Sequence, residues 1–390
     1  MAPVVADMVA RSTYLKQELL EFARRPRYAK ALRAAIGGAG GTSTGGGDLI
    51  AHLDAFVLEH RLPDGRTLVD HFVAAHPDLP EADCAMLLGW RDVVEGLFEV
   101  DRRDGDAILL INLIDELVYR VHSNAGTGVF TRMPPGSFVL TRLVPVGDEW
   151  LFSGGQSLYP SSARPQIARV AAELAMERPA LVFRNPEKLK RGWEIQRNYH
   201  EWFVEFFGAD LVILPGAQIA ERMRGYWRYC ARRVGEKAGP KAGASPGFEL
   251  PLPPGLTERA TVGVISDEVD GLNFCADFGV VAEAFADPEI VIRQPQPYRR
   301  TVQHYLRDDS ISALPFLRLA AQDEAKASRL FQLVLKRPSF SWQADGEALM
   351  RRRKPASFDR PALPSIIPIS PIIEEHHRAD QSDRPDRSDR

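Results

Sequence analysis

The sequence has few cysteines and no long apolar stretch. Its three cysteines, Cys84, Cys230 and Cys275, lie far apart among 390 residues, which excludes a disulfide framework and a paired-cysteine metal site. The longest mostly apolar stretch, 107–114, has eight residues, whereas a membrane-spanning helix needs roughly 18. The N-terminus carries Asp7 and no apolar segment, so we expect no signal peptide. These absences predict a cytoplasmic protein that does not enter a membrane.

Several catalytic motifs are also missing. The nine histidines include no HExxH pattern. The stretch 37–47 holds seven glycines, but Asp48 follows where a phosphate-binding loop needs Lys and then Ser or Thr. Ser153 precedes two glycines without forming the GxSxG pattern of a nucleophile elbow. We therefore expect no cofactor, and we interpret 37–47 as a flexible tether behind a semi-detached helical arm.

The charge is nearly balanced overall and uneven along the chain. A net charge of −3 with 45% apolar residues excludes a uniformly basic nucleic-acid coat and a highly charged disordered chain. Residues 48–118 contain sixteen acidic and five basic side chains, and residues 184–241 contain twelve basic and seven acidic ones. This asymmetry indicates either two different partners or two halves that attract one another, and the second is the simpler interpretation.

Hydrophobic periodicity predicts an α+β protein. Three-to-four-residue spacing indicates helices at 12–36, 48–60, 67–76 and 80–90, and short alternating runs indicate strands between 97 and 152. We expect a helical N-terminal arm, a small antiparallel β-barrel or curled sheet, and a mixed, then mainly helical, C-terminal part. The expected segments are an arm and tether (1–47), helices with the β module (48–160), a mixed α/β part (161–236), a Pro/Gly linker (237–256), a mainly helical part (257–354) and a disordered tail (355–390).

One segment of the tail differs from the rest. Residues 361–373 carry regularly spaced prolines, five isoleucines and a leucine, which makes the segment extended and too apolar for a free tether. Two interpretations remain open. It docks along the protein's own body, which we favour, or it is a peptide ligand for another protein.

The strongest candidate binding segment is helical. Guanidinium groups neutralise phosphates and aromatic rings stack on bases, so their interleaving is typical of a nucleic-acid surface. Alternatively, the helix is amphipathic, with its rings packed inward and its arginines in solvent. The candidate nucleic-acid-binding residues are Arg222, Arg224, Tyr226, Trp227, Arg228, Arg232 and Arg233.

An acidic loop gives a second candidate site. Ser266, Glu268, Asp270 and Asp277 partly follow the oxygen-ligand spacing of a calcium loop around Gly271. The alternative is a solvated acidic hairpin. As an enzyme, the chain could use Asp267, Glu268 and Asp270 with a lysine or histidine from elsewhere, as a hydrolase or nuclease does.

Several strings also carry a resemblance. HRLPDGRTLVDHF (60–72), LLGWRDVVEGLFEV (87–100), YRVHSN (119–124) and GSFVLTRLVPVGDEWLFSGG (136–155) resemble a module of an uncharacterised family of bacterial hypothetical proteins from high-GC genomes. A related arrangement is similar to the region beside the SEC-C zinc-binding motif. The chain has no CxC and no terminal Cys-His pair, so the resemblance implies a fold and carries over neither a zinc site nor catalytic residues.

The sequence as a whole favours a non-catalytic binding or adaptor protein with an anion-binding face. The expected partner is nucleic acid or another protein, and the oligomeric state is open. The alternative is a metal-dependent hydrolase or nuclease-like enzyme that uses the 266–277 loop.

Overall fold

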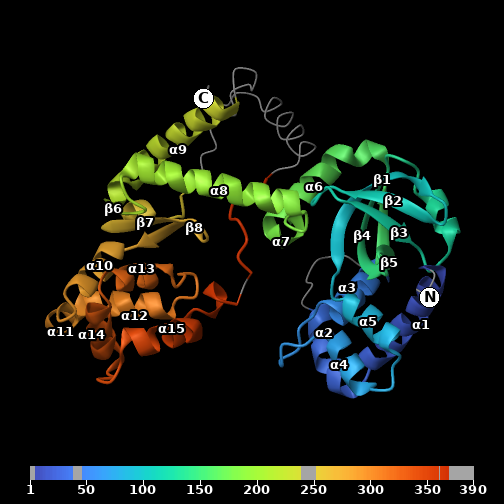
Figure 1. The fold of residues 1–390 in the computed structure, drawn as a ribbon, viewed down its shortest axis with the longest axis horizontal. Helices are drawn as coiled ribbons and strands as arrows, with labels where there is room; N and C mark the ends of the chain where they lie inside the picture. The colour runs from blue at the N-terminus through green and yellow to red at the C-terminus, as the bar shows by residue number, and fades with distance from the viewer. Residues whose placement is uncertain (1–4, 38–45, 239–251, 360, 369–390) are drawn as a thin grey trace. The chain divides into compact units, whose positions relative to one another are not determined.

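Two sheets organise the chain, each inside its own unit. The computed structural model describes residues 5–37, 46–238, 252–359 and 361–368 (Figure 1). Unit 1 comprises the described residues up to Lys188 with 367–368, and unit 2 comprises those of 189–366. Each unit combines helices with strands, which confirms the α+β prediction. The expected tether (38–45), most of the linker (239–251) and the tail beyond 368 lie outside the described residues.

Five helices precede the strands of unit 1. They are α1 Val5–Ala23, α2 Ala29–Gly37, α3 Gly46–Leu58, α4 Leu68–Ala75 and α5 Glu81–Gly89. The single helix expected over 12–36 is interrupted at Pro26, which lacks a backbone N–H and starts a short 3-10 turn. Leu15, Leu19 and Phe22 of α1 are buried in a core shared with α3 and α4. Helix α1 is thus a wall of unit 1 rather than a semi-detached arm.

The strands of unit 1 close into a small barrel. They are β1 Val94–Asp104, β2 Ala107–Asn112, β3 Val118–His122, β4 Phe138–Val146 and β5 Glu149–Tyr159, in the order β1-β2-β3-β5-β4. Neighbouring strands are antiparallel as expected, with one exception: β3 runs parallel to β5, where Val121 pairs with Trp150. The alternating side chains of Phe98, Leu110 and Val139 fill the interior.

Two helical layers cover the outside of this barrel. Helix α6 Arg164–Glu177 and the short α7 Pro179–Val182 pack on Leu97 and Phe138, which point outward from β1 and β4. On another side, Val144 and Leu151 join the core of the N-terminal helices. Much of the barrel's outer surface is therefore buried by helices that precede and follow it in the sequence.

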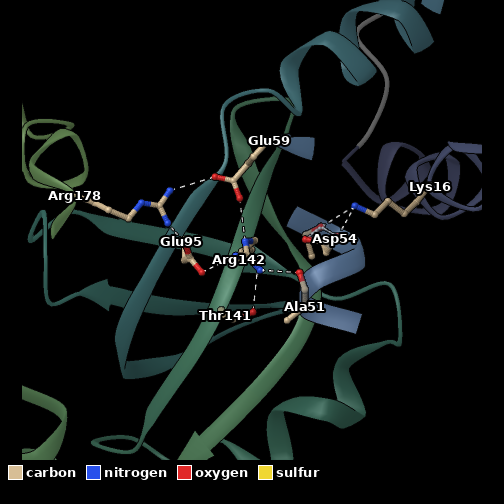
Figure 2. A network of polar contacts seen from close by, with 9 residues as sticks. Lys16, Ala51, Asp54, Glu59, Glu95, Thr141, Arg142 and Arg178 are labelled. Atoms are coloured by element: carbon tan, nitrogen blue, oxygen red, sulfur yellow. Dashed lines mark hydrogen bonds and ion pairs between the residues drawn. The ribbon is translucent and has the colours of Figure 1, made fainter. Parts of the chain in front are cut away.

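Four charged residues, Arg142, Glu59, Glu95 and Arg178, form a ring of ion pairs that connects these layers to the barrel. Figure 2 shows Arg142 of β4 between Glu59, which follows α3, and Glu95 of β1. Its Nε lies 3.1 Å from Glu59 Oε2 and its Nη2 lies 2.7 Å from Glu95 Oε1. Arg178, which follows α6, also pairs with both carboxylates. A third donor of Arg142, Nη1, reaches the carbonyl oxygen of Ala51 in α3 at 3.1 Å.

Unit 2 is built on a three-stranded antiparallel sheet. Its strands are β6 Leu211–Pro215, β7 Thr261–Asp267 and β8 Gly271–Ala276, with β7 in the centre. The unit-2 part of α8 Pro186–Phe207 and helix α9 Gly216–Ala238 share a core with Val262 and Val264 on one face of the sheet (Figure 1). Ile265 faces the opposite side, where the remaining helices pack. Those helices are α10 Phe278–Ala286, α11 Ile290–Arg293, α12 Arg300–Arg307, α13 Leu314–Gln322, α14 Glu324–Leu335 and α15 Trp342–Arg353.

Part of the proline-rich segment contacts unit 2. The backbone N–H and the hydroxyl of Ser365 both donate to Gln196 Oε1 of α8, at 2.7 and 2.8 Å. The Gln196 amide in turn donates to the carbonyl oxygens of Glu268 and Val269, both at 2.9 Å. At Ser365 the segment therefore docks on its own chain, whereas residues 369–373 lie outside the described residues.

The charged ring makes a prediction about stability. Replacing Arg142 with Met leaves Glu59 and Glu95 partly buried with Arg178 as their remaining partner, so the free energy of unfolding should fall by about 2 kcal/mol. Urea unfolding followed by circular dichroism measures this change. Arg102→Ala is the matched control, because the Arg102–Asp101 pair is exposed and its loss should cost under about 0.5 kcal/mol. Equal losses in the two variants would contradict the role of the ring.

Candidate functional site

The aromatic residues of α9 lie mostly inside the protein. Tyr226 is 2% exposed and Trp227 is 6% exposed, and the Tyr226 hydroxyl donates to the carbonyl oxygen of Tyr199 at 2.7 Å. Helical periodicity places these rings on the same face as Met223 and Cys230, toward the sheet. The expectation that rings and guanidinium groups share an outward surface is therefore wrong for Tyr226 and Trp227, and neither ring is accessible to a base.

Tyr229 and Arg233 are occupied by contacts within unit 2. The Tyr229 hydroxyl donates to Glu205 Oε2 of α8 at 2.5 Å, and this hydrogen bond raises the pKa of Tyr229. Arg233 Nη1 lies 3.0 Å from the same Glu205 oxygen, and Arg233 Nε lies 3.9 Å from Glu236. Arg233 is therefore neutralised by carboxylates of its own chain and is removed from the candidate binding set.

The other four arginines of α9 remain exposed. Arg222, Arg224, Arg228 and Arg232 form no ion pair with any carboxylate in the described part of the chain. Arg222 stands apart, with its guanidinium 5.4 Å from the ring centroid of Phe207. The other three recur every four residues, which corresponds to about 6 Å along the axis per step. We call Arg224, Arg228 and Arg232 the α9 arginine row.

Most of the hydrogen-bond donors of the arginine row are not used by groups of the chain itself. The Nε of Arg224 donates to the Ala220 carbonyl at 3.3 Å and that of Arg228 donates to the Arg224 carbonyl at 3.4 Å, which orients both side chains along the helix. The terminal guanidinium nitrogens keep their donors for a ligand, and such nitrogens match the oxygens of phosphate or carboxylate groups. Two exposed acidic groups lie on the same face: Glu221 at its start and Glu236 one helical turn beyond Arg232. The row is thus suited to anions spread along a line.

The charged surface around Arg120, beside the β1–β2 turn of the barrel, has the opposite character. The five-stranded closure is also that of OB-type barrels, which bind oligonucleotides through strands 2 and 3 and the β1–β2 and β4–β5 loops. Here Arg120 of β3 is held by Asp104 and Asp106 at the β1–β2 turn and by Glu149 at the start of β5. The hydrogen bond from Arg120 lowers the pKa of Asp104, so this carboxylate stays charged. An acidic, self-paired surface of this kind does not suit a polyanion, and fold likeness alone assigns no function.

The acidic loop does not gather a set of metal ligands. Asp270 lies at the β7–β8 turn, but Asp277 lies at the far end of β8, seven residues and about 23 Å of extended chain away. Asp277 instead pairs with Arg259 at 3.2 Å. In the described residues no three His, Cys, Asp or Glu side chains are close enough to hold a metal ion. The predicted cation site formed by Ser266, Glu268, Asp270 and Asp277 is therefore wrong.

Asp267 and its neighbours serve the turn itself. Burial tends to raise the pKa of Asp267, but hydrogen bonds from the backbone of Asp270 and Val269, together with Arg318, outweigh it and lower that pKa. The Arg318 guanidinium lies 2.6 Å from Asp267 and 3.0 Å from Asp210. Asp267 therefore stabilises the turn. It is not available as a catalytic group, so the carboxylate set proposed for a hydrolase or nuclease is reduced to Glu268 and Asp270.

Sequence reasoning missed two α8 residues beside this turn. His200 Nδ1 lies 3.2 Å from Ser266 Oγ and its Nε2 lies 4.0 Å from Glu268 Oε1. Gln196, one helical turn earlier, binds the turn backbone and Ser365. Their four-residue spacing could have indicated a shared helix face. Their partners are 66 or more residues away, so no local signal pointed to them.

Comparisons with known proteins add no functional information. No family model matches the chain, and neither the curated proteins nor the solved structures contain a match. Among the described helices, none has the length and apolar character needed to cross a membrane.

Substitutions on the buried and on the exposed side of α9 should differ in their effect on the free energy of unfolding. Trp227→Ala removes a buried ring and should lower the free energy of unfolding by about 3 kcal/mol. Arg228→Ala changes an exposed side chain of the same helix and should stay within about 0.5 kcal/mol of the wild type. Urea unfolding followed by circular dichroism compares the two variants. A small effect of Trp227→Ala would mean that this ring does face solvent.

Proposed function

We propose that this chain is a non-catalytic binding protein whose α9 arginine row binds a polyanion, with nucleic acid as the first to test. The observation that supports the proposal is the unpaired state of Arg224, Arg228 and Arg232 among the described residues. Other arginines, such as Arg142 and Arg120, are held by nearby carboxylates. Three exposed cations in a line, without a carboxylate partner among the described residues, favour an external anion.

The spacing of the row suits a phosphate backbone. Arg224 and Arg232 lie eight residues apart, about 12 Å along the helix axis. Phosphates follow one another every 3.4 Å of axial rise along one strand of duplex DNA, so the row spans about three of them. Because Tyr226 and Trp227 are buried, the contact relies on charge rather than on stacking. Such binding positions a protein on the backbone and has little sequence preference.

We also propose that the protein works in a reducing compartment, the cytoplasm. Cys84, Cys230 and Cys275 are all free thiols. Burial raises the pKa of Cys230 and of Cys275 to about 12, so both remain protonated and unreactive at neutral pH. Free, inert thiols are the usual state of cysteine in the cytoplasm.

Salt dependence tests the proposed contact. Fluorescence anisotropy with labelled single-stranded and duplex DNA gives the Kd at several salt concentrations. The double variant Arg228→Ala/Arg232→Ala removes two phosphate contacts. The negative slope of log K against log salt should therefore become less steep by about 1.5. The variant should also weaken binding to different DNA sequences by a similar factor.

A matched double variant controls for the change in net charge. Arg102 and Arg103 are exposed on β1 of unit 1, so Arg102→Ala/Arg103→Ala removes the same two charges at another surface. This variant should keep the wild-type slope. The proposal fails if the wild type does not bind DNA, or if the α9 double variant leaves the slope unchanged.

A further inference from the structure

Residues 361–366, which we call the strap, belong to unit 2 but form no helix or strand there. Pro364 is buried, Leu363 and Ile366 are half-buried, and Ser365 is exposed. The two prolines of the strap restrict its backbone to extended conformations, which reduces the entropy lost when it docks. The strap is therefore held as a bound peptide is held, by a few side-chain contacts and single hydrogen bonds.

One buried amide on α8 receives the strap. The Gln196 side chain is 2% exposed, and its Nε2 donates to the carbonyl oxygens of Glu268 and Val269. Because a carbonyl oxygen can only accept, these two bonds fix which end of the amide faces the β7–β8 turn. The other end, Oε1, accepts both the backbone N–H and the hydroxyl of Ser365. Gln196 thus presents a fixed acceptor, which the backbone N–H of an extended peptide satisfies.

Gly271, the first residue of β8, leaves room for the strap. Its φ is +69°, which favours glycine, and a Cβ at this position would collide with Ser365 Oγ and lie 3.1 Å from Ser365 Cβ. The distance from the same Cβ to Gln196 Oε1 would be 3.6 Å, an ordinary contact. The missing side chain therefore makes space for the docked residue and not for Gln196.

The contacts of the strap are of a kind that a competitor can replace. The strap contains no charged residue, so no side-chain ion pair adds to its hold. Each hydrogen bond to Gln196 replaces one with water and therefore contributes little net stability. When the strap leaves, Nε2 of Gln196 keeps its carbonyl partners and Oε1 loses two donors. The open surface then lacks an N–H or O–H donor at this point.

We propose that Gln196, Gly271 and the β7–β8 turn form a docking surface for an extended, proline-containing peptide of another protein, and that the strap occupies this surface as an internal competitor. The incoming peptide donates a backbone N–H to Gln196 Oε1, places a small residue against Gly271 and buries a proline where Pro364 lies. The strap is tethered, so its effective concentration at the surface is high and a weak peptide does not displace it. The surface is separate from the α9 arginine row.

A labelled peptide of residues 361–368 tests the surface, with fluorescence anisotropy measuring its binding to the full chain. Ser365→Asp in the chain should release the strap, because an ionised carboxylate has no hydrogen to donate and places negative charge against Gln196 Oε1. This variant should bind the wild-type peptide at least about tenfold more tightly than the wild-type chain does, since its own strap no longer competes. Ser339→Asp adds the same charge at another exposed serine of unit 2 and should bind as the wild type does.

Variants of the peptide make the test independent of folding. A peptide carrying Ser365→Asp should bind the Ser365→Asp chain at least about tenfold more weakly than the wild-type peptide does, because it loses the hydroxyl donor and repels the acceptor. Gly271→Ala in that chain should also weaken binding, with circular dichroism confirming that the chain is folded. The proposal is overturned if the Ser365→Asp chain does not bind the wild-type peptide, if it binds both peptides equally, or if it binds no more tightly than the wild-type chain.

Light scattering distinguishes the internal strap from the strap of a second copy. The wild-type chain and the Ser365→Asp chain should have the same mass in solution. A wild-type dimer that Ser365→Asp dissociates would mean that the strap docks on a neighbouring copy, and the internal competition would be refuted.

Discussion

The guanidinium of Arg142 decides how the helices of unit 1 attach to the barrel. It projects outward from β4 and contacts Glu59, Glu95 and the carbonyl oxygen of Ala51, so that one side chain joins a strand, its neighbouring strand and the α3 region. Arg178 closes the ring from the end of α6. Hydrophobic contacts hold these layers together, but they are non-directional. The fixed geometry of an arginine between two carboxylates supplies the orientation.

The same principle explains the uneven charge of the sequence. The acidic segment 48–118 is matched inside unit 1 by cations from outside that segment: Asp83 by Arg11, Glu99 by Arg164, and Asp92 by Arg184. Much of the negative charge is therefore already compensated where it lies. The basic segment is compensated less completely, because Glu205 and Glu236 hold Arg233 while the α9 arginine row has no carboxylate among the described residues. This difference favours an external partner for the basic side.

The sequence predicted local structure better than contacts between distant residues. Alternating side chains and turn residues located the strands of the barrel, since these signals lie within a few residues. The parallel pairing of β3 with β5 was missed because it depends on how the chain returns after β4. On α9, the sequence showed arginines interleaved with aromatic residues, but it did not show which of these side chains other elements cover. The contacts that decide this come from α8, whose Glu205 lies 24 residues before Tyr229 of α9.

The α9 arginine row and the Lys16–Asp54 pair of unit 1 treat charge in opposite ways. The α9 arginine row keeps its cations in water, where their attraction for an anion is long-ranged and is screened by salt within about 10 Å. Unit 1 instead removes most of Lys16 and Asp54 from water and pairs them with each other, with Nζ and Oδ1 2.6 Å apart. Salt screens a buried pair of charges much less than it screens exposed charges. Ionic strength should therefore act on the proposed contact at α9, which depends on released counterions, far more than on the buried pair of unit 1.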